Sequence, residues 1–309
     1  MSKIKELKEN NRDSVVCVVK EVSKGVSTSQ SAYLNLVLQD NTGKIDAKKW
    51  EANEKDIESF KVGNVLSLLV DPINYRGSMQ LKIVDYDLLK DFKDIKELII
   101  KPPVPTDTLE LEFKSFINKI NNLDIKNIVV EIVKNVYDEF IFHPAAKTNH
   151  HEYTSGLLHH EVSMLKLAEA ISNLYPTINK DLLYGGIILH DIGKIRELSG
   201  PITTEYTIEG RLLGHISIIN AEIAKVAEKL NIKSQAVILL QHMVLSHHGK
   251  LEYGSPVMPH TLEAEVMYLI DNMDSKITMI NKALADLEDN TFSNKIMPLE
   301  GQAFYKYKL

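Results

Sequence analysis

Cysteine is almost absent from this sequence: Cys17 is the only one in 309 residues. A chain with one cysteine can form no internal disulfide, and it suits a reducing compartment. Long apolar runs are also missing, since a stretch such as "VLSLLV" at 65–70 falls far short of the roughly 20 residues of a membrane helix. The charged first ten residues lack the apolar segment of a signal peptide. These absences predict a soluble, cytoplasmic protein that does not contact membranes.

An excess of positive charge is missing as well. The net charge of −6 argues against a highly basic nucleic-acid-binding protein. Residues 1–92 carry 14 basic and 14 acidic residues, so the whole acidic excess lies in the later part of the chain. That later part would need cations, or a basic neighbour, to hold a polyanion.

The first ninety residues are rich in short β-prone segments separated by turn residues. The pattern predicts five strands, at 14–22, 31–40, 41–50, 64–73 and 80–89. Asn41-Thr42-Gly43 has the composition of a hairpin turn between the second and the third. Five strands in fewer than a hundred residues favour a small barrel or sandwich.

This region resembles the OB-fold domains that bind oligonucleotides, especially in "YLNLVLQDNTGKIDAKKW" and "VGNVLSLLVDPINYRGSMQLKI". In that family, bases stack on aromatic side chains of the sheet while basic side chains contact phosphates. The resemblance therefore implies a surface that binds single-stranded nucleic acid. Its candidate residues are Tyr33, Trp50, Tyr75, Arg76, Lys24, Lys48, Lys49 and Lys82. The alternative for each aromatic residue is a place in the barrel core.

Three prolines in "KPPVPT" at 101–106 interrupt any helix or central strand and mark a domain boundary. We expect a barrel domain over 1–92, a proline-containing linker over 93–108 and a helical domain over 109–309. Beyond the prolines, apolar residues recur at helical spacing. The predicted helices cover 109–120, 125–140, 157–174, 181–197, 214–230, 234–247 and 261–288, and no strand pattern is convincing there. The fold class is thus an all-β barrel followed by an all-α bundle.

Histidine is missing from residues 1–142, and all eleven histidines lie between His143 and His260. Several of them fall on predicted helices together with aspartate, as in "LHD" at 189–191. Imidazole and carboxylate together suit a divalent ion such as Mn²⁺, Fe²⁺, Ni²⁺ or Zn²⁺, and the single distant cysteine excludes a thiolate zinc site. The second domain is therefore predicted to bind a metal.

The order of these residues, with "HDIGK" at 190–194 as its centre, resembles the HD-domain metal-dependent phosphohydrolases. The resemblance implies a ligand set of His160, His190, Asp191, His215, His247, His248 and Asp271, in which Asp191 bridges two ions. Gly156 departs from the pattern, because two-metal members often carry an acidic residue four positions before the first histidine. One ion and two ions both remain open.

The resemblance extends to the YhaM-type 3′→5′ exoribonucleases, which combine an OB-like domain, a proline-rich connection and an HD domain. It covers nearly the whole chain, through "NHHEYTSGLLHH", "GIILHDIGKIRELSGP", "GHISI" and "LSHHGKLEYGSP". It implies cleavage of single-stranded RNA from the 3′ end, release of 5′-monophosphates and Mn²⁺ as cofactor. Single-stranded DNA is left open as a second substrate, and a homo-oligomer as the state of assembly.

The chemistry explains why phosphodiester hydrolysis needs such a site. A divalent ion lowers the pKa of its bound water and offsets charge on phosphoryl oxygens. Asp191 and Lys194 are the predicted catalytic residues, with Lys194, one helical turn after His190, placed to steady developing charge on a phosphate. His150, His151, Arg196 and Arg211 are weaker candidates for contact with the substrate.

Two alternatives to the exoribonuclease remain. One is a phosphohydrolase of small or cyclic nucleotides, in which the OB-like domain is regulatory. The other is a nucleic-acid-binding protein without catalysis. A separate surface that follows a strand helps only when several nucleotides extend beyond the cleaved bond, which favours a polymeric substrate.

Overall fold

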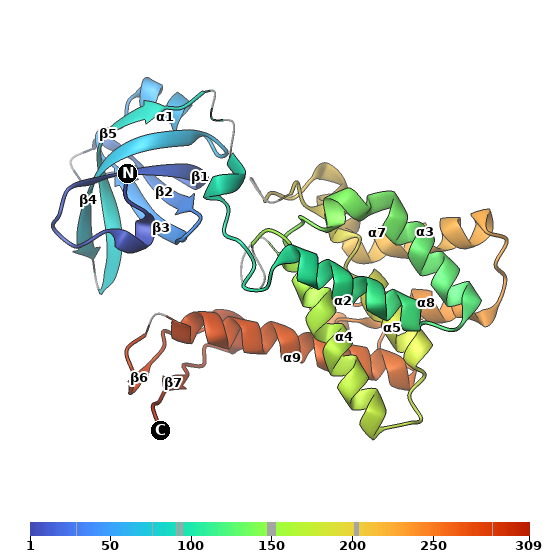
Figure 1. Cartoon of the computed structure of the whole chain (residues 1–309). Helices are drawn as coiled ribbons and strands as arrows, with labels where there is room; N and C mark the ends of the chain where they lie inside the picture. The colour runs from blue at the N-terminus through green and yellow to red at the C-terminus, as the bar shows by residue number, and fades with distance from the viewer. Residues whose placement is uncertain are drawn as a thin grey trace. The chain divides into compact units, whose positions relative to one another are not determined.

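The computed structural model describes residues 1–28, 30–75, 77–90, 92, 95–146, 153–200, 204–285 and 287–309, without the side chain of Lys96. The chain divides into two compact units, Met1–Lys101 and a second formed by Pro102–Gly200 with Glu205–Leu309 (Figure 1). The division falls inside the predicted linker, and the exact domain boundaries stay a prediction. No helix among the described residues is long and apolar enough to span a membrane.

The first unit is a closed five-stranded barrel (Figure 1). Its strands are β1 (Asp13–Val26), β2 (Ala32–Asp40), β3 (Gly43–Lys49), β4 (Val65–Tyr75) and β5 (Ser78–Leu88). They follow the order β1-β2-β3-β5-β4, and β1 pairs with β4 to close the barrel. All neighbouring pairs are antiparallel except β3 with β5. This is the OB-fold topology, so the predicted fold of this domain is confirmed.

The barrel interior follows from the two-residue period of its strands. Along β2, Leu34, Leu36 and Leu38 point inward and are buried, while the alternating residues Tyr33, Asn35 and Val37 are partly exposed. Cys17 on β1 is fully buried, and burial raises the pKa of its thiol. At the predicted turn, Asp40 Oδ1 accepts a hydrogen bond from the amide of Thr42 at 2.7 Å. The interior of the barrel is therefore a small apolar core.

Short elements complete the first unit. The helix α1 (Glu54–Ser59), which the sequence analysis did not predict, lies between β3 and β4. Its six residues are too few to show a helical period, although Asn53 caps it by accepting from the amide of Asp56. Short 3-10 helices lie at Ile4–Glu6 and Ile95–Leu98.

The second unit is a helical bundle. Its helices are α2 (Thr106–Lys119), α3 (Leu123–Phe140), α4 (Gly156–Leu174), α5 (Lys180–His190), α6 (Lys194–Glu197), α7 (Ile208–Lys229), α8 (Gln235–Ser246) and α9 (Leu262–Ala285). The prediction of a helical second domain is confirmed. Two short strands, β6 (Thr291–Phe292) and β7 (Tyr305–Lys306), form a hairpin that the analysis missed, because two residues per strand give no readable period.

Helix α5 is the centre of this bundle and contacts α3, α4, α7, α8 and α9. Every residue from Leu182 to His190 is buried, which explains the aliphatic run before His190. The single helix predicted over 181–197 is wrong, because α5 ends at His190 and α6 begins at Lys194. The polar pair His190 and Asp191 therefore lies where a buried helix stops.

Candidate metal centre

Five different helices bring the predicted ligands together. His160 comes from α4, His190 and Asp191 from the end of α5, His215 from α7, and Asp271 from α9. His247 and His248 directly follow α8. Side chains that are separated by up to 111 positions in the sequence thus converge in one region of the second unit.

The break after α5 positions Asp191. Its backbone has φ −109° and ψ 0°, a sparsely populated region, and it caps the helix. Two residues later, a Cβ on Gly193 would lie 2.3 Å from the carbonyl oxygen of His215, so only glycine allows this approach of the two backbones. His215 in turn follows Gly214, whose φ of +71° interrupts α7. The two glycines let His215 come close to Asp191.

The two carboxylate oxygens of Asp191 face two different groups of imidazoles. Asp191 Oδ2 lies 3.4 Å from His190 Nε2 and 3.8 Å from His160 Nε2. Asp191 Oδ1 lies 3.5 Å from His215 Nε2 and 3.9 Å from His247 Nε2. A carboxylate between two groups of nitrogen ligands is the arrangement of a bridging ligand in a two-metal site.

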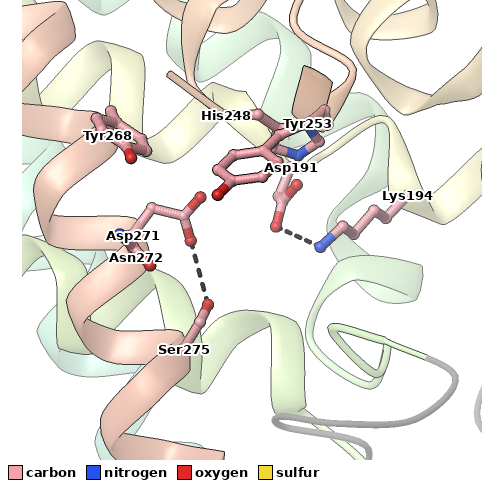
Figure 2. Close-up of a pocket in the computed structure, with 8 residues that line it drawn as sticks. All are labelled: Asp191, Lys194, His248, Tyr253, Tyr268, Asp271, Asn272 and Ser275. Carbon is pink, nitrogen blue, oxygen red and sulfur yellow. Dashed lines mark hydrogen bonds and ion pairs between the residues drawn. The ribbon is translucent and has the colours of Figure 1, made fainter. Parts of the chain in front are cut away.

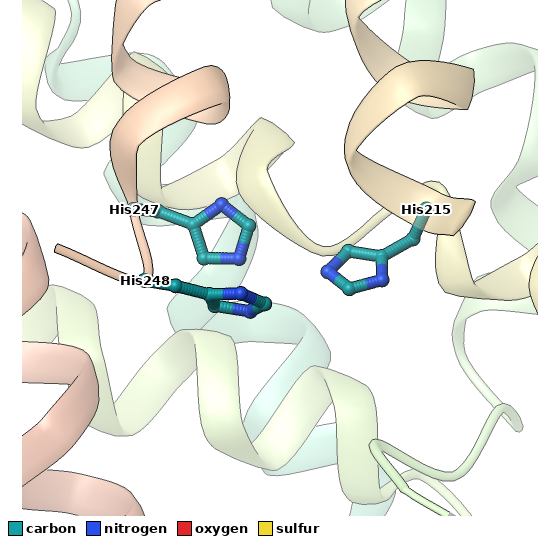
Figure 3. A group of neighbouring side chains, drawn as sticks. All are labelled: His215, His247 and His248. Carbon is teal, nitrogen blue, oxygen red and sulfur yellow. The ribbon is translucent and has the colours of Figure 1, made fainter. Parts of the chain in front are cut away.

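The first group consists of His160, His190 and Asp191, whose ligand atoms all lie within 4.8 Å of one another. Asp271 Oδ1 lies 3.3 Å from His160 Nε2 and so adjoins this group. The second group consists of His215, His247 and His248, under the same distance limit. Figure 3 shows their rings turned toward a common space, with His215 opposite the adjacent pair.

Backbone carbonyls orient two of the rings. His190 Nδ1 lies 2.6 Å from the carbonyl oxygen of Ile187, and His247 Nδ1 lies 2.8 Å from that of Val244. A carbonyl can only accept, so each Nδ1 carries a proton, and Nε2 is the nitrogen left to bind a metal. Both rings therefore turn Nε2 toward the centre. Burial lowers the pKa of His190, but the neighbouring Asp191 carboxylate outweighs it and raises that pKa to about 9, so a metal would displace a proton there.

Carboxylates orient two more rings. His160 Nδ1 lies 2.7 Å from Asp274 Oδ2, and His215 Nδ1 lies 3.1 Å from both carboxylate oxygens of Glu197. Such partners fix the ring orientation and increase the basicity of the opposite nitrogen. Neither acid was predicted from the sequence, although Asp274 lies about one helical turn after Asp271 and thus on the same face of α9.

Several polar atoms at the centre are buried without a hydrogen-bond partner among the described residues. They include Nε2 of His190, His215 and His247, and Oδ1 of Asp191. Leaving such an atom unsatisfied costs about 1–3 kcal/mol. Unpartnered atoms of this kind at the edges of both ligand groups fit bound cations, which would satisfy them. The residues present therefore fit a divalent metal site.

The electrostatics of the centre also favour a cation. Burial lowers the pKa of His160, but the neighbouring Asp271 and Asp274 carboxylates outweigh it and hold that pKa well above its usual value. Burial, followed by the neighbouring His248, holds the pKa of His247 well below its usual value, so that ring is neutral. The carboxylates near His160 therefore attract positive charge, whereas His247 offers a neutral ring.

Lys194 lies beside Asp191, with 2.7 Å between its Nζ and Asp191 Oδ2. Burial lowers the pKa of Lys194, but the Asp191 carboxylate outweighs it and raises that pKa above its usual value. Burial in turn raises the pKa of Asp191, while Lys194 and then His190 hold it well below the usual value. Lys194 belongs to α6 and not to the helix of His190, so its predicted position one turn along that helix is wrong, although it does reach the centre.

A buried carboxyl group stands behind the first group of ligands. Glu161 is fully buried and its Oε1 lies 3.6 Å from His190 Nδ1. Burial raises the pKa of Glu161 to about 8. The sequence analysis did not single out this residue, because its position directly after His160 gave no sign of its burial.

An open pocket of about 260 Å³ gives access to the centre. Figure 2 shows its lining, which comprises Asp191, Lys194, His248, Tyr253, Tyr268, Asp271, Asn272 and Ser275. Four of these residues were not predicted from the sequence: Tyr253, Tyr268, Asn272 and Ser275. Tyr253 accepts a hydrogen bond through its carbonyl oxygen from His248 Nδ1, at 2.9 Å. Its place in "LSHHGKLEYGSP" was the available signal.

The four weaker candidates for substrate contact lie outside this pocket or outside the described residues. Arg196 is exposed and forms a bidentate pair with Glu209, and neither it nor Arg211 is among the residues that line this pocket. His150 and His151, like Arg76 of the barrel, lie outside the described residues.

On the barrel, the structure gathers aromatic side chains around Lys48. The rings of Tyr33 and Trp50 lie 4.9 Å apart. Lys48 Nζ lies 5.1 Å, 5.2 Å and 6.0 Å from the ring centres of Tyr33, Trp50 and Tyr75. Trp50 and Tyr75 are 37% and 48% exposed, so they are not part of the core.

Two further predicted lysines lie near this aromatic cluster. Lys82 on β5 is exposed and pairs in register with Lys48 on β3. Lys24 on β1 is exposed and directly precedes Gly25, which lies under the Tyr33 ring. Aromatic rings beside ammonium groups are typical of surfaces that bind single strands.

The fold and the centre define the class of the protein. The family model described as "HD domain" matches residues 157–276, a segment that contains every candidate ligand from His160 to Asp271. An OB-type barrel on the same chain adds a second domain to this phosphohydrolase-like bundle.

Curated relatives extend the match to nearly the whole chain. The 3′-5′ exoribonuclease YhaM of Geobacillus sp. (strain WCH70) is 44% identical over 294 residues, which cover 94% of this chain and 91% of that protein. The YhaM protein of Bacillus subtilis (strain 168) is 41% identical over 291 residues, or 94% and 93% of the two chains. The chain belongs to the YhaM family, and the predicted family is confirmed.

Among solved structures, the second OB-fold domain of replication protein A from Methanococcus maripaludis matches part of the chain. It is 18% identical, covers 29% of this chain and 95% of that domain, and has a TM-score of 0.25. The OB assignment rests on strand order and not on this likeness.

Proposed function

We propose that this chain is a metal-dependent 3′→5′ exoribonuclease that hydrolyses single-stranded RNA to 5′-mononucleotides in the cytoplasm. The observation that carries the proposal is the buried convergence of imidazole Nε2 atoms on the two oxygens of Asp191. The YhaM relatives are named for this activity. Single-stranded DNA, which lacks the 2′-hydroxyl, is a second candidate substrate.

We propose Mn²⁺ as the cofactor, because the donors are imidazole nitrogens and carboxylate oxygens without thiolate. The two faces of Asp191 favour two ions. One would be held by His160, His190, Asp191 and Asp271, and the other by Asp191, His215, His247 and His248. When bound, such ions make water a stronger nucleophile and offset charge on the phosphoryl oxygens.

The chain's own residues orient this centre and complement the substrate. Carbonyl and carboxylate partners at Nδ1 hold each imidazole so that Nε2 points inward. The Lys194 ammonium, protonated and facing the pocket beside Asp191, would bind a phosphate oxygen. Arg196, Arg211, His150 and His151 are assigned no step.

The barrel would bind the RNA strand away from the cleaved bond. Tyr33, Trp50 and Tyr75 would stack on bases, while Lys48 and Lys82 would contact phosphates. Lys24 lies close enough on β1 to add a phosphate contact, and Arg76 remains a candidate from the sequence. The division of labour between residues 1–92 and 109–309 is part of the proposal.

The direct test incubates the full chain with 5′-labelled single-stranded RNA and Mn²⁺, with and without a chelator. We expect a ladder that shortens from the 3′ end, disappears with chelator and returns when Mn²⁺ is restored. Cyclic dinucleotides are run in parallel. Cleavage of these alone would support a small-nucleotide phosphohydrolase, and RNA binding without cleavage would support a binding protein.

A further inference from the structure

A long groove lies along α9 in the second unit. It has a volume of about 730 Å³. One wall is a stripe of α9 with four-residue spacing, which consists of Tyr268, Asn272, Lys276 and Ile280. The other is the segment after α9, which folds back beside the helix (Figure 1) and contributes Met297, Pro298, Leu299, Glu300, Gln302 and Phe304.

The groove and the metal pocket adjoin each other. Tyr253, Tyr268 and Asn272 line both of them. Figure 2 shows Tyr268 and Asn272 on α9 and Tyr253 between α9 and Asp191. The stripe from Tyr268 to Ile280 is roughly 18 Å long at 1.5 Å per residue. That is about five stacked nucleotides at 3.4 Å each, and fewer for an extended strand.

The chemistry of the groove near the centre suits a nucleotide strand. Tyr253 is 55% exposed, and Lys250 Nζ lies 5.2 Å from its ring centre. Tyr268 is partly buried against the backbone of Gly249, where a Cβ would lie only 2.4 Å from its ring, so that ring is held in place. Two aromatic rings beside a lysine can stack on bases and contact a phosphate.

Farther from the metal pocket, the groove is lined by both charged and apolar side chains. Lys276 is exposed on the α9 wall, and Glu300 is the one carboxylate among the lining residues. Met297 is 76% exposed, and Pro298 and Phe304 add apolar surface. Among the lining residues two lysines stand against one acid, although Lys250 also forms an exposed ion pair with Glu252 at 3.6 Å. The groove therefore lacks the acidic excess of the rest of this domain.

We propose that this groove binds the nucleotides that directly precede the 3′-terminal nucleotide of the substrate, with Tyr253 and Tyr268 stacking on bases and Lys250 and Lys276 contacting phosphates. The occupant is the strand that enters the metal pocket, because the two cavities share a wall. The inference rests on the proposed exoribonuclease activity. It assigns the C-terminal segment, to which the sequence analysis gave no role, to substrate binding.

The test compares Lys276→Glu with wild-type chain on two RNA substrates, a dinucleotide and a decamer. Lys276 lies outside the metal pocket. We expect KM for the decamer to rise about three- to ten-fold with kcat nearly unchanged, and KM for the dinucleotide to stay near the wild-type value. The slope of log KM against log salt concentration should fall by about 0.7 for each lost phosphate contact.

Lys225→Glu is the matched control, because it reverses one exposed charge on α7 and lines neither cavity. Lys250→Glu is a second variant and should reproduce the decamer effect. Equal losses on both RNAs would mean that the groove holds the reacting nucleotide, and no loss beyond the control would mean that it holds no RNA. Either result overturns the inference. Failure of the wild-type chain to shorten RNA would instead overturn the proposed function.

Discussion

The barrel and the helical bundle hold their candidate functional residues in opposite ways. Trp50 and Tyr75 stand on an open surface around Lys48. His160, His190 and His247 are fully buried and each is oriented by a bond at Nδ1. An exposed aromatic surface can adapt to any base, whereas a metal centre needs fixed donors. The difference suggests that binding is shared among interchangeable contacts and that chemistry depends on each single one.

Asp191→Asn should have the largest effect, because it changes the residue at the middle of the buried metal centre. One oxygen is replaced by an amide group, so the bridge between the two histidine groups is lost. We expect kcat to fall by about 1,000-fold or more, with RNA affinity within a few-fold of wild type. Labelled-ladder assays and filter binding measure the two quantities. Loss of both together would contradict separate binding and catalytic regions.

Asp274→Ala removes the partner of His160 Nδ1 without removing a ligand. We expect Mn²⁺ affinity to fall about 10- to 100-fold, because the ring loses its orientation and its basicity. Isothermal titration with Mn²⁺ gives the affinity. Asp274→Asn keeps an acceptor oxygen and should recover part of it, and a variant as weak as alanine would argue against a positioning role.

Trp50→Ala tests the exposed aromatic surface of the barrel. We expect RNA affinity to fall about ten-fold, since stacking on an aromatic side chain contributes about 1–3 kcal/mol per base. Turnover of a dinucleotide should change much less. Phe292→Ala, which removes an aromatic side chain that is 66% exposed on the second unit, is the matched control for fluorescence anisotropy with labelled RNA. If both variants bind equally, the barrel surface is not the binding site.

Gly193→Ala should lower catalysis less than loss of a ligand does, because it displaces His215 from Asp191 without removing a donor, and it should have a clear effect on stability. Its Cβ would meet the carbonyl oxygen of His215 at 2.3 Å, so the second unit must shift at a cost of about 1–3 kcal/mol. Thermal melting monitored by the circular dichroism signal of the helices should show this destabilisation. Trp50 fluorescence reports on the barrel and should show an unchanged melting transition.

Gly43→Ala is its control, because a Cβ there meets nothing within 4 Å. Its helical melting should match that of wild type. Equal destabilisation by the two variants would mean that the close approach of Gly193 to His215 does not exclude a Cβ at position 193.

Much of the architecture was readable from the sequence. The five barrel strands and most helices follow from two- and four-residue apolar periods, and the predicted strand over 31–40 matches β2 closely. The break after His190 was not readable, because the segment 181–197 keeps an apolar helical period throughout. The structure shows that α5 ends at His190 and that the backbone of Gly193, three residues later, closely approaches His215.

The candidate metal centre could likewise be predicted only in part. The resemblance of "HDIGK" and its surrounding histidines to a known family selected His160, His190 and Asp191, and the structure places these residues together. Tyr253 lies in a stretch that resembles the same family, but no spacing pattern assigned it or Tyr268 a role. The fold makes both of them candidates, because they line two adjacent cavities.

The sequence by itself determined which chemical groups are available: imidazoles and carboxylates in one half of the chain, aromatics and lysines on strands in the other. The tertiary structure decided which oxygen of Asp191 faces which histidines, which nitrogen each ring presents, and where a strand could leave the pocket. The physical reason is that periodicity records local conformation and burial. Distances between atoms on different helices depend on how those helices pack.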